Sequence, residues 1–313
     1  MSTVNALTID VEDYFQVSAF EGCVPVADWE RHPLRVEKNT RLVLEMLGER
    51  GVRATFFVLG WVAGKCPSLV RDIHRGGHEI ACHGNNHRRV GTQSRLEFRA
   101  DIRDSKAALE DLTGEPVRGY RAPSYSISLK TLWAFDELVE AGYLYDSSVF
   151  PVRHDFYGIP DWPRFPFTVS RGPGGAWRPQ QGAGGAQQAQ LFEFPITTLS
   201  LWGKNLPIAG GGYFRLFPYR FTRWGLMRIN RLEGRPFVFY LHPWELDPGQ
   251  PRMAGATAKA RFRHYLNLDK TEPRFARLLD DFSFTTLRAL LLESPCQSAA
   301  VTAEQALPAA APL

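Results

Sequence analysis

The sequence has little of what marks a disulfide-rich, zinc-finger or membrane-spanning protein. Its 4 cysteines are scattered over 313 residues without Cys-x-x-Cys spacing, which argues against a zinc knuckle or a disulfide framework. No hydrophobic run approaches the length needed to span a membrane. The first residues also lack the basic segment and apolar segment of a secretory leader. We therefore expect a protein of the reducing cytoplasm without a membrane span.

The charge is modest as well. Lys and Arg number 37 against 33 Asp and Glu, and the excess is spread along the chain without a long basic run. This pattern does not indicate nucleic-acid binding. Aromatic residues, in contrast, are plentiful, with 8 Trp, 10 Tyr and 21 Phe. Most of these rings are expected in the core, although their number also fits a sugar-binding cleft.

Strand-like and helix-like segments alternate through the first half of the chain. Apolar runs predict strands at 6–9, 54–59, up to 83, 117–120 and 142–146. Helical spacing predicts helices at 36–50, 67–75, 94–112 and 129–141. Such an order requires parallel strands with helices outside them, in an open sheet or a barrel. The sequence therefore predicts an α/β fold.

The alternation breaks between residues 151 and 190, where Gly, Gln and Ala gather, and we expect an exposed insertion there. Strands at 191–196 and 236–241 and helices near 218–232 and 273–282 then resume the pattern. From residue 293 on, Ala and Pro dominate, which predicts a disordered tail over 293–313. The expected organisation is one domain over residues 1–292 with one insertion.

Polar side chains follow several of the predicted strands. Asp10, His83, Arg121, Asp146 and His242 each stand at or just after a strand end. In a parallel barrel the carboxyl ends of the strands converge on one face, and that face carries the active site. We therefore expect these residues to lie close together.

His83 and His87 are the strongest candidates for metal ligands. Side chains four positions apart on a helical turn or tight loop can point the same way, so both imidazoles can hold one ion. The carboxylates of Asp10, Glu12 and Asp13 follow the first strand and repel one another unless a cation relieves the repulsion. Two histidines and one carboxylate, with a position left for water, are a common catalytic zinc arrangement. The pattern favours a divalent metal, with zinc the first choice.

Three further residues are candidates for acid–base chemistry. Arg121 could hydrogen-bond a catalytic carboxylate and keep it ionised, although it could also be a surface arginine. His242 follows a buried strand and is the natural general acid, because histidine titrates near neutrality. Asp146 could orient His242 and raise its pKa, or could simply cap a helix.

The order of these motifs resembles that of the NodB-homology polysaccharide deacetylases, a carbohydrate esterase family. The resemblance covers about residues 5 to 290 and rests on the stretches 8–13, 77–87, 121–125, 145–148 and 241–243. It implies a distorted (β/α)7-type barrel. It also implies a metal-dependent hydrolase that removes N-acetyl groups from an amino-sugar polysaccharide or oligosaccharide.

The resemblance gives each motif residue a role: Asp10 the base, His83 and His87 the metal ligands, Arg121 the residue that positions the base, and His242 the acid. The family commonly has two adjacent aspartates in its first motif, whereas Val11 follows Asp10 here. Glu12 is therefore expected to supply the metal carboxylate, with Asp13 as the alternative.

The stretches 10–15, 211–215 and 241–245 further resemble a subgroup linked to bacterial exopolysaccharide and exosortase gene clusters, which implies an exopolysaccharide substrate. Other functions stay open. An amide hydrolase on the same barrel could act on a small cyclic imide or an allantoin-like molecule. A non-catalytic carbohydrate-binding module would not need a complete set of ligands, base and acid. A metal-dependent phosphohydrolase would need more than Gly210–Gly212 to cradle phosphate. The oligomeric state cannot be read from the sequence.

Overall fold

The computed structural model describes residues 3–153, 157–172, 174–180 and 190–293. Its strands are β1 (Val4–Val11), β2 (Thr55–Val58), β3 (Glu79–Cys82), β4 (Gly119–Tyr120), β5 (Tyr145–Asp146), β6 (Phe167–Arg171), β7 (Trp177–Pro179), β8 (Gln190–Glu193), β9 (Thr198–Leu201), β10 (Lys204–Pro207), β11 (Val238–Leu241) and β12 (Ser283–Thr285). Its helices are α1 (Val36–Gly48), α2 (Gly60–Lys65), α3 (Pro67–Arg75), α4 (Arg95–Thr113), α5 (Ala134–Glu140), α6 (Gly211–Leu216), α7 (Tyr219–Arg228), α8 (Ala258–Tyr265), α9 (Thr271–Asp281) and α10 (Leu287–Glu293).

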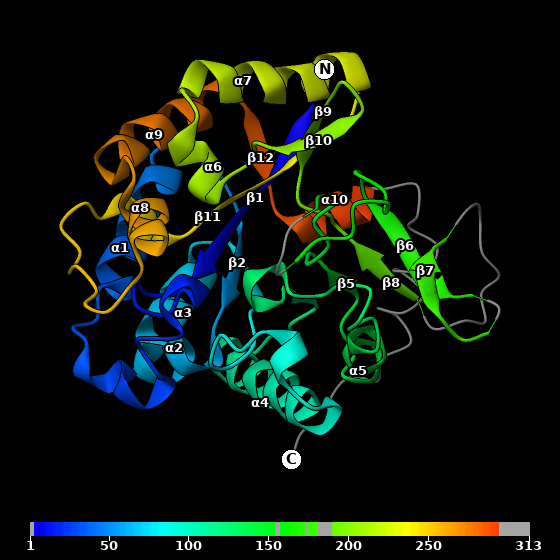
Figure 1. Ribbon diagram of the computed structural model, residues 1–313, viewed down its shortest axis with the longest axis horizontal. Helices are drawn as coiled ribbons and strands as arrows, with labels where there is room; N and C mark the ends of the chain where they lie inside the picture. Colours follow the sequence, from blue (N-terminus) through cyan, green and yellow to red (C-terminus); the bar gives the residue numbers. More distant parts are fainter. Residues whose placement is uncertain (1–2, 154–156, 173, 181–189, 294–313) are drawn as a thin grey trace.

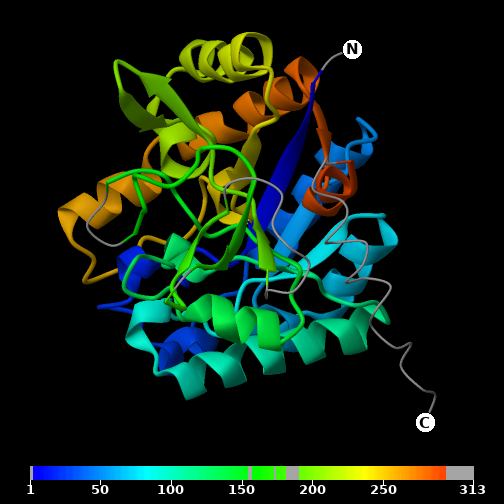
Figure 2. The ribbon, with the colours of Figure 1, turned by 90° about the vertical axis from the view of Figure 1, so that its right-hand side faces the viewer.

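Within these described residues, seven parallel strands form the barrel wall in the order β11-β1-β2-β3-β4-β5-β8, with helices outside them (Figures 1 and 2). No backbone ladder joins β8 to β11 in the described part of the chain. The gap is spanned instead by Thr197, whose hydroxyl oxygen accepts from the backbone N–H of Val238 at 2.8 Å. The predicted α/β fold of the distorted (β/α)7 type is thus confirmed.

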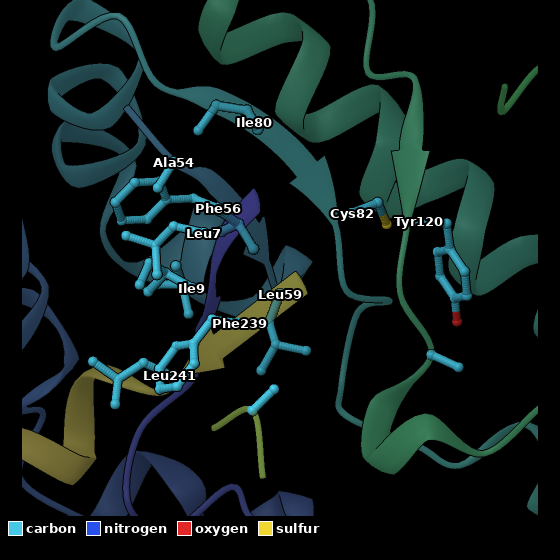
Figure 3. Close-up of a cluster of buried hydrophobic side chains, with 14 of the residues drawn as sticks. Leu7, Ile9, Ala54, Phe56, Leu59, Ile80, Cys82, Tyr120, Phe239 and Leu241 are labelled. Carbon is cyan, nitrogen blue, oxygen red and sulfur yellow. The ribbon is translucent and has the colours of Figure 1, made fainter. Parts of the chain in front are cut away.

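Successive side chains of β1 point to opposite faces of the sheet, as in any strand. Leu7 and Ile9 pack with Phe56 and Phe239 in the large cluster between sheet and helices (Figure 3). Ala6, on the other face, belongs to a smaller cluster inside the barrel, which α10 helps to fill. The even-numbered positions of β1 therefore face the barrel interior, and this direction carries Asp10 inward.

Most predicted helices form close to their expected bounds, although α5 begins at Ala134 and not at residue 129. Capping signals mark several of these ends. In α4 the Ser94 side chain accepts from the backbone N–H of Glu97, and the Glu97 side chain accepts from that of Ser94. The same helix ends at Gly114, which adopts a left-handed conformation with φ of 72°. Pro67 opens α3 in its first turn.

The segment expected to be an exposed insertion is packed where the structure describes it. Strands β6 and β7 form a hairpin that extends the sheet antiparallel to β8. Val169 of β6 and Trp177 of β7 are buried, and Trp177 lies edge-on to Phe135 of α5. Residues 181–189, and the tail predicted to be disordered beyond residue 293, lie outside the described residues. Among the helices that are described, none is long and apolar enough to cross a membrane.

Candidate active site

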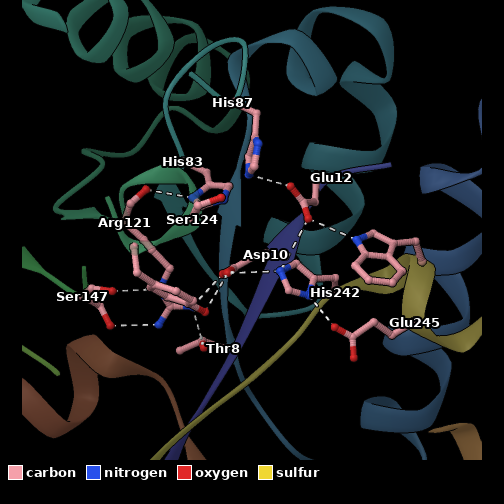
Figure 4. A network of polar contacts seen from close by, with 12 residues as sticks. Thr8, Asp10, Glu12, His83, His87, Arg121, Ser124, Ser147, His242 and Glu245 are labelled. Atoms are coloured by element: carbon pink, nitrogen blue, oxygen red, sulfur yellow. Dashed lines mark hydrogen bonds and ion pairs between the residues drawn. The ribbon is translucent and has the colours of Figure 1, made fainter. Parts of the chain in front are cut away.

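The side chains at the carboxyl end of the barrel meet as the sequence predicts, with one exception. Asp10 and Glu12 come from the end of β1, His83 from the end of β3, Arg121 from the end of β4 and His242 from the end of β11 (Figure 4). All five are buried or nearly so. The exception, Asp146, is described below.

Glu12, His83 and His87 form the candidate metal centre. Their possible ligand atoms all lie within 4.8 Å of one another. The Nδ1 atom of His83 lies 2.8 Å from the backbone carbonyl oxygen of Arg121, which can only accept a hydrogen bond. His83 therefore carries its proton on Nδ1 and keeps the Nε2 lone pair for a metal. Burial lowers the pKa of His83 to about 4, which favours this neutral form.

His87 is aimed at Glu12 by an unusual turn. Gly84 has φ of 72° and His87 itself has φ of 51°, a left-handed conformation that costs energy outside glycine. Asp101 holds this turn, because its carboxylate accepts from the backbone N–H of Asn85 at 3.1 Å. The His87 Nε2 atom consequently lies 2.8 Å from the Glu12 Oε2 atom. A lone pair and a carboxylate oxygen at this distance repel unless a proton or cation lies between them, so the donor set fits a divalent cation.

The structure separates Glu12 from its neighbour Asp13. Asp13 points away from the histidines and accepts from the backbone N–H groups of Tyr14, Arg35 and Val36 at 2.7 to 2.9 Å. It therefore caps the start of α1. Glu12 accepts from the indole N–H of Trp244 at 3.1 Å and faces His87 with its other oxygen.

The two neighbouring carboxyls also titrate in opposite directions. Burial alone would raise the pKa of Glu12, but the imidazoles of His87, His242 and His83 hold it well below its usual range. Burial raises the pKa of Asp13, against the effect of its hydrogen bonds. Glu12 is thus the ionised carboxylate of the site, as expected of a metal ligand.

Asp10 is held by Arg121, which is fully buried. The Arg121 guanidinium donates to Asp10 Oδ1 at 2.6 Å and to the Thr8 hydroxyl at 2.8 Å. Its other nitrogens donate to the carbonyl and hydroxyl oxygens of Ser147, and its face lies 4.1 Å from the ring centre of Phe57. All three guanidinium nitrogens of Arg121 are thus hydrogen-bonded, and one of them donates to Asp10 Oδ1. Asp10 Oδ2 faces His242 and the hydroxyl of Tyr125.

His242 lies across the cleft from the histidine pair. Its Nε2 atom is 3.5 Å from Glu12 Oε1 and 3.8 Å from Asp10 Oδ2. Its Nδ1 atom is 2.6 Å from Glu245 Oε1. Burial would lower the pKa of His242, but the carboxylates of Glu12, Glu245 and Asp10 raise it to about 9. The imidazole ring of His242 stacks on the indole of Trp244, with ring centres 5.2 Å apart, and this contact fixes the orientation of its plane.

The prediction that Asp146 orients His242 is wrong. Asp146 accepts from the hydroxyl of Ser148 at 2.6 Å and pairs in the sheet register with Glu193 of β8. His242 follows β11, beyond the gap in the barrel wall, so its Nδ1 atom meets Glu245 instead.

Glu245 is the site residue that sequence reasoning missed. A 3-10 turn over Pro243–Leu246 follows His242 directly, and such a turn brings a side chain three positions on back to its start. The other Glu245 oxygen lies 3.4 Å from Nε of Arg215, a buried residue that donates to the backbone carbonyls of His264 and Leu266. The proline after His242 and the glutamate at the third position were the available signal.

The groups face a cleft of about 240 Å³. Aromatic side chains form much of its wall, namely those of Tyr125, Tyr157, Tyr240 and Trp244. Asp10, Glu12, both metal-candidate histidines and His242 reach the same space. A buried carboxylate, a histidine and a cluster suited to a metal therefore share one opening, an arrangement that would suit hydrolysis by an activated water.

Comparison with solved structures identifies the fold class. A Mycobacterium smegmatis protein described as a polysaccharide deacetylase superposes with a TM-score of 0.58 at 20% identity, covering 99% of this chain and 93% of that one. A Pseudomonas aeruginosa protein with the same description gives a TM-score of 0.53 at 16% identity, covering 92% and 89% of the two chains. At these identities the likeness establishes a shared fold.

Sequence comparison then addresses the family. Residues 28–143 match the polysaccharide deacetylase family model, and residues 147–292 match a domain of unknown function, DUF3473. A peptidoglycan-N-acetylglucosamine deacetylase of Bacillus cereus is 34% identical over 104 residues, which are 33% of this chain and 47% of that protein. A chitooligosaccharide deacetylase of Sinorhizobium fredii is 35% identical over 82 residues, 26% of this chain and 38% of that one. The chain thus spans less than half the length of these relatives, and the findings together support the polysaccharide deacetylase family that the motifs predicted.

Proposed function

We propose that the protein is a metal-dependent hydrolase that removes N-acetyl groups from an amino-sugar polysaccharide. The observation that carries the proposal is the cluster of Glu12, His83 and His87 in the same cleft as Asp10 and His242. The named activities of the Bacillus cereus and Sinorhizobium fredii relatives support an N-acetylated glycan as substrate. The resemblance of three stretches to the exopolysaccharide-linked subgroup supports an exopolysaccharide as the polymer.

Glu12, His83 and His87 would hold the divalent cation, with zinc the first choice from the mixed nitrogen and oxygen donors. When bound, the ion polarises the acetyl carbonyl and makes a bound water acidic enough to attack it. The protein itself holds these ligand side chains in place through hydrogen bonds before any substrate binds. His83 is fixed by the carbonyl of Arg121, and Glu12 by the indole of Trp244.

Asp10 acts as the general base. It takes the proton of the attacking water on the carboxylate edge that faces the cleft, since Arg121 occupies Oδ1 at 2.6 Å. The buried guanidinium orients Asp10 during the transfer.

His242 acts as the general acid. The amine leaving group must be protonated as the carbon–nitrogen bond breaks, and the Nε2 proton of His242 points toward the reacting groups. Glu245 binds Nδ1 and so fixes the ring in the orientation that presents Nε2. The products are acetate and a free amino sugar.

Acetate release from N-acetylglucosamine oligomers tests the proposal. Asp10→Asn and His242→Ala should each lower turnover by about 100- to 10,000-fold while the metal stays bound, because neither residue belongs to the ligand set. A chelator should abolish turnover, and added zinc should restore it. Near wild-type turnover of either variant would contradict the role proposed for the residue replaced. Hydrolysis of cyclic imides without acetate release from any glycan would favour the small-amide alternative.

A further inference from the structure

The outer side of α7 presents an unusual combination of side chains. One side of the helix and of the turn that extends it carries Arg220, Arg223, Trp224, Arg228 and Arg231. Arg220, Trp224, Arg228 and Arg231 follow one another at spacings of three and four residues, and Arg223 lies beside Trp224. All five are exposed, and we call this set the α7 face. The buried residues lie on the opposite side, namely Thr222, Gly225, Leu226 and Ile229. Both ribbon views place α7 along an edge of the molecule, with no other helix outside it (Figures 1 and 2).

The positive charge of the α7 face is poorly compensated. Arg223 pairs with Asp281 at 2.9 Å. Among the described residues no ion pair is found for Arg220, Arg228 or Arg231. The acidic residue at the end of the extension, Glu233, is already engaged by Arg164 at 2.7 Å. Three guanidinium groups on one surface therefore have their charge directed to solvent.

Large apolar side chains accompany these charges. Trp224 is 47% exposed, and Leu232 in the following turn is 69% exposed. Strands β9 and β10 lie beside α7 in both views, and Leu199 of β9 packs closely against Gly225 of the helix (Figures 1 and 2). The turn of this hairpin carries Trp202, which is 96% exposed. Single exposed apolar residues are ordinary, but Trp224 and Leu232 stand among the arginines of α7 and its extension, and the adjoining hairpin adds a further exposed tryptophan. This combination indicates a binding surface.

We propose that the α7 face, together with Trp202, binds the surface of an anionic lipid bilayer. Arginine forks match phosphate oxygens, and tryptophan prefers the headgroup region, where its ring and its N–H are both satisfied. The arginines also offer donors only, whereas a sugar polymer presents donors and acceptors alike.

The position of the α7 face leaves the cleft open. Asn230, in the extension of α7, hydrogen-bonds Asn5 near the start of β1, whereas Asp10 and Glu12 stand at the end of that strand. A bilayer on the α7 face would thus lie toward the opposite end of the barrel from the metal-candidate cluster. The inference does not depend on the proposed deacetylase activity.

Co-sedimentation with lipid vesicles tests this inference. The full chain should bind vesicles of phosphatidylcholine mixed with phosphatidylglycerol, and salt should weaken that binding. Arg228→Gln/Arg231→Gln should reduce the partition coefficient roughly 30-fold, because each arginine contributes a factor of about five. The matched control is Arg71→Gln/Arg103→Gln, which removes two exposed arginines from α3 and α4 on other sides of the molecule and should leave binding unchanged.

Three results would overturn the inference. In the first, the protein binds vesicles of phosphatidylcholine alone as strongly as the mixed vesicles. In the second, both double variants lose the same amount of vesicle binding. In the third, the protein is retained on polygalacturonate but does not bind vesicles. Trp202→Ser provides a second, independent reading, because it should weaken vesicle binding several-fold while leaving its salt dependence unchanged. Unchanged thermal unfolding of all variants would exclude loss of fold as the cause.

Discussion

The two halves of the chain supply different parts of the candidate site. The first half, up to β5, provides the metal-candidate residues and Asp10 with its arginine, at strand ends and, for His87, in the turn after β3. The second half provides His242 and Glu245, which follows in a 3-10 turn and contacts the His242 ring. Arg215 of α6 in turn contacts Glu245. Trp244 joins the halves by donating to Glu12 at 3.1 Å. In the proposed mechanism, water activation would therefore rest on residues of the barrel wall. Protonation of the leaving group would depend on how the second half folds around the end of β11.

The largest effect is expected within the first half, at the neighbouring residues Glu12 and Asp13. Glu12 is a proposed metal ligand, whereas Asp13 caps α1. Glu12→Ala removes a proposed ligand, so metal content and turnover should fall together, turnover by about 1,000-fold or more. Asp13→Ala leaves the backbone N–H groups of Arg35 and Val36 without their acceptor. It should lower the free energy of unfolding by about 2 kcal/mol while the protein still binds one equivalent of metal. Metal analysis and denaturant unfolding of both variants measure the two effects.

The opposite pattern would reverse the assignment. If Asp13→Ala lost the metal and Glu12→Ala kept it, the ligand would be the second carboxylate, and the capping geometry of α1 would have to differ from that described. Glu12→Gln is a useful companion variant, because it keeps the size and the Trp244 contact while removing the negative charge.

A variant of Glu245 tests the second half, and the expected effect is smaller. Glu245→Gln should lower turnover of an N-acetyl substrate about 10- to 100-fold, less than the loss of the acid itself. An aryl acetate ester should be hardly affected, because its phenolate leaves without being protonated. A merely structural role of Glu245 would slow both substrates alike. Asp146→Asn is the matched control and should spare both reactions, since Asp146 faces Ser148 and Glu193. Parallel losses on amide and ester in Glu245→Gln would contradict the positioning role.

Much of the first half could be predicted, because strand ends in a parallel barrel must converge and because its motifs lie at those ends. The choice between Glu12 and Asp13 could not be predicted, since it depends on α1 beginning beside Asp13 some twenty residues later in the chain. Glu245 was missed for a different reason. Its approach to His242 depends on a 3-10 turn, which neither strand nor helix periodicity reveals.

The packing of the segment after residue 151 could not be predicted either. Its composition resembles that of a loop, yet Val169 and Trp177 are buried once β8 is available as a partner strand. Sheet extension of this kind depends on pairing with a strand later in the chain. Local composition does not contain that information.

The smallest effect concerns the seam where the two halves meet, at Asp146 of β5 and Glu193 of β8. Burial raises the pKa of Asp146 to about 6, and burial together with the Asp146 carboxylate raises the pKa of Glu193 well above its usual range. Both groups therefore hold protons more tightly in the folded chain than in the unfolded one. Their contribution to stability is fully present below their unfolded pKa values and is lost as the pH rises through the folded values.

The free energy of unfolding should consequently increase as the pH is lowered from about 8 to about 5, by an amount on the order of 1 kcal/mol. Glu193→Gln should flatten this dependence, because its amide oxygen can still accept from the backbone N–H of Val149 and its NH₂ group can donate to Asp146. Thermal unfolding of both proteins across this pH range measures the difference. Identical slopes would mean that Glu193 does not hold its proton more tightly in the folded chain. The contrast between the fully ionised Glu12 and the proton-holding seam would then fail.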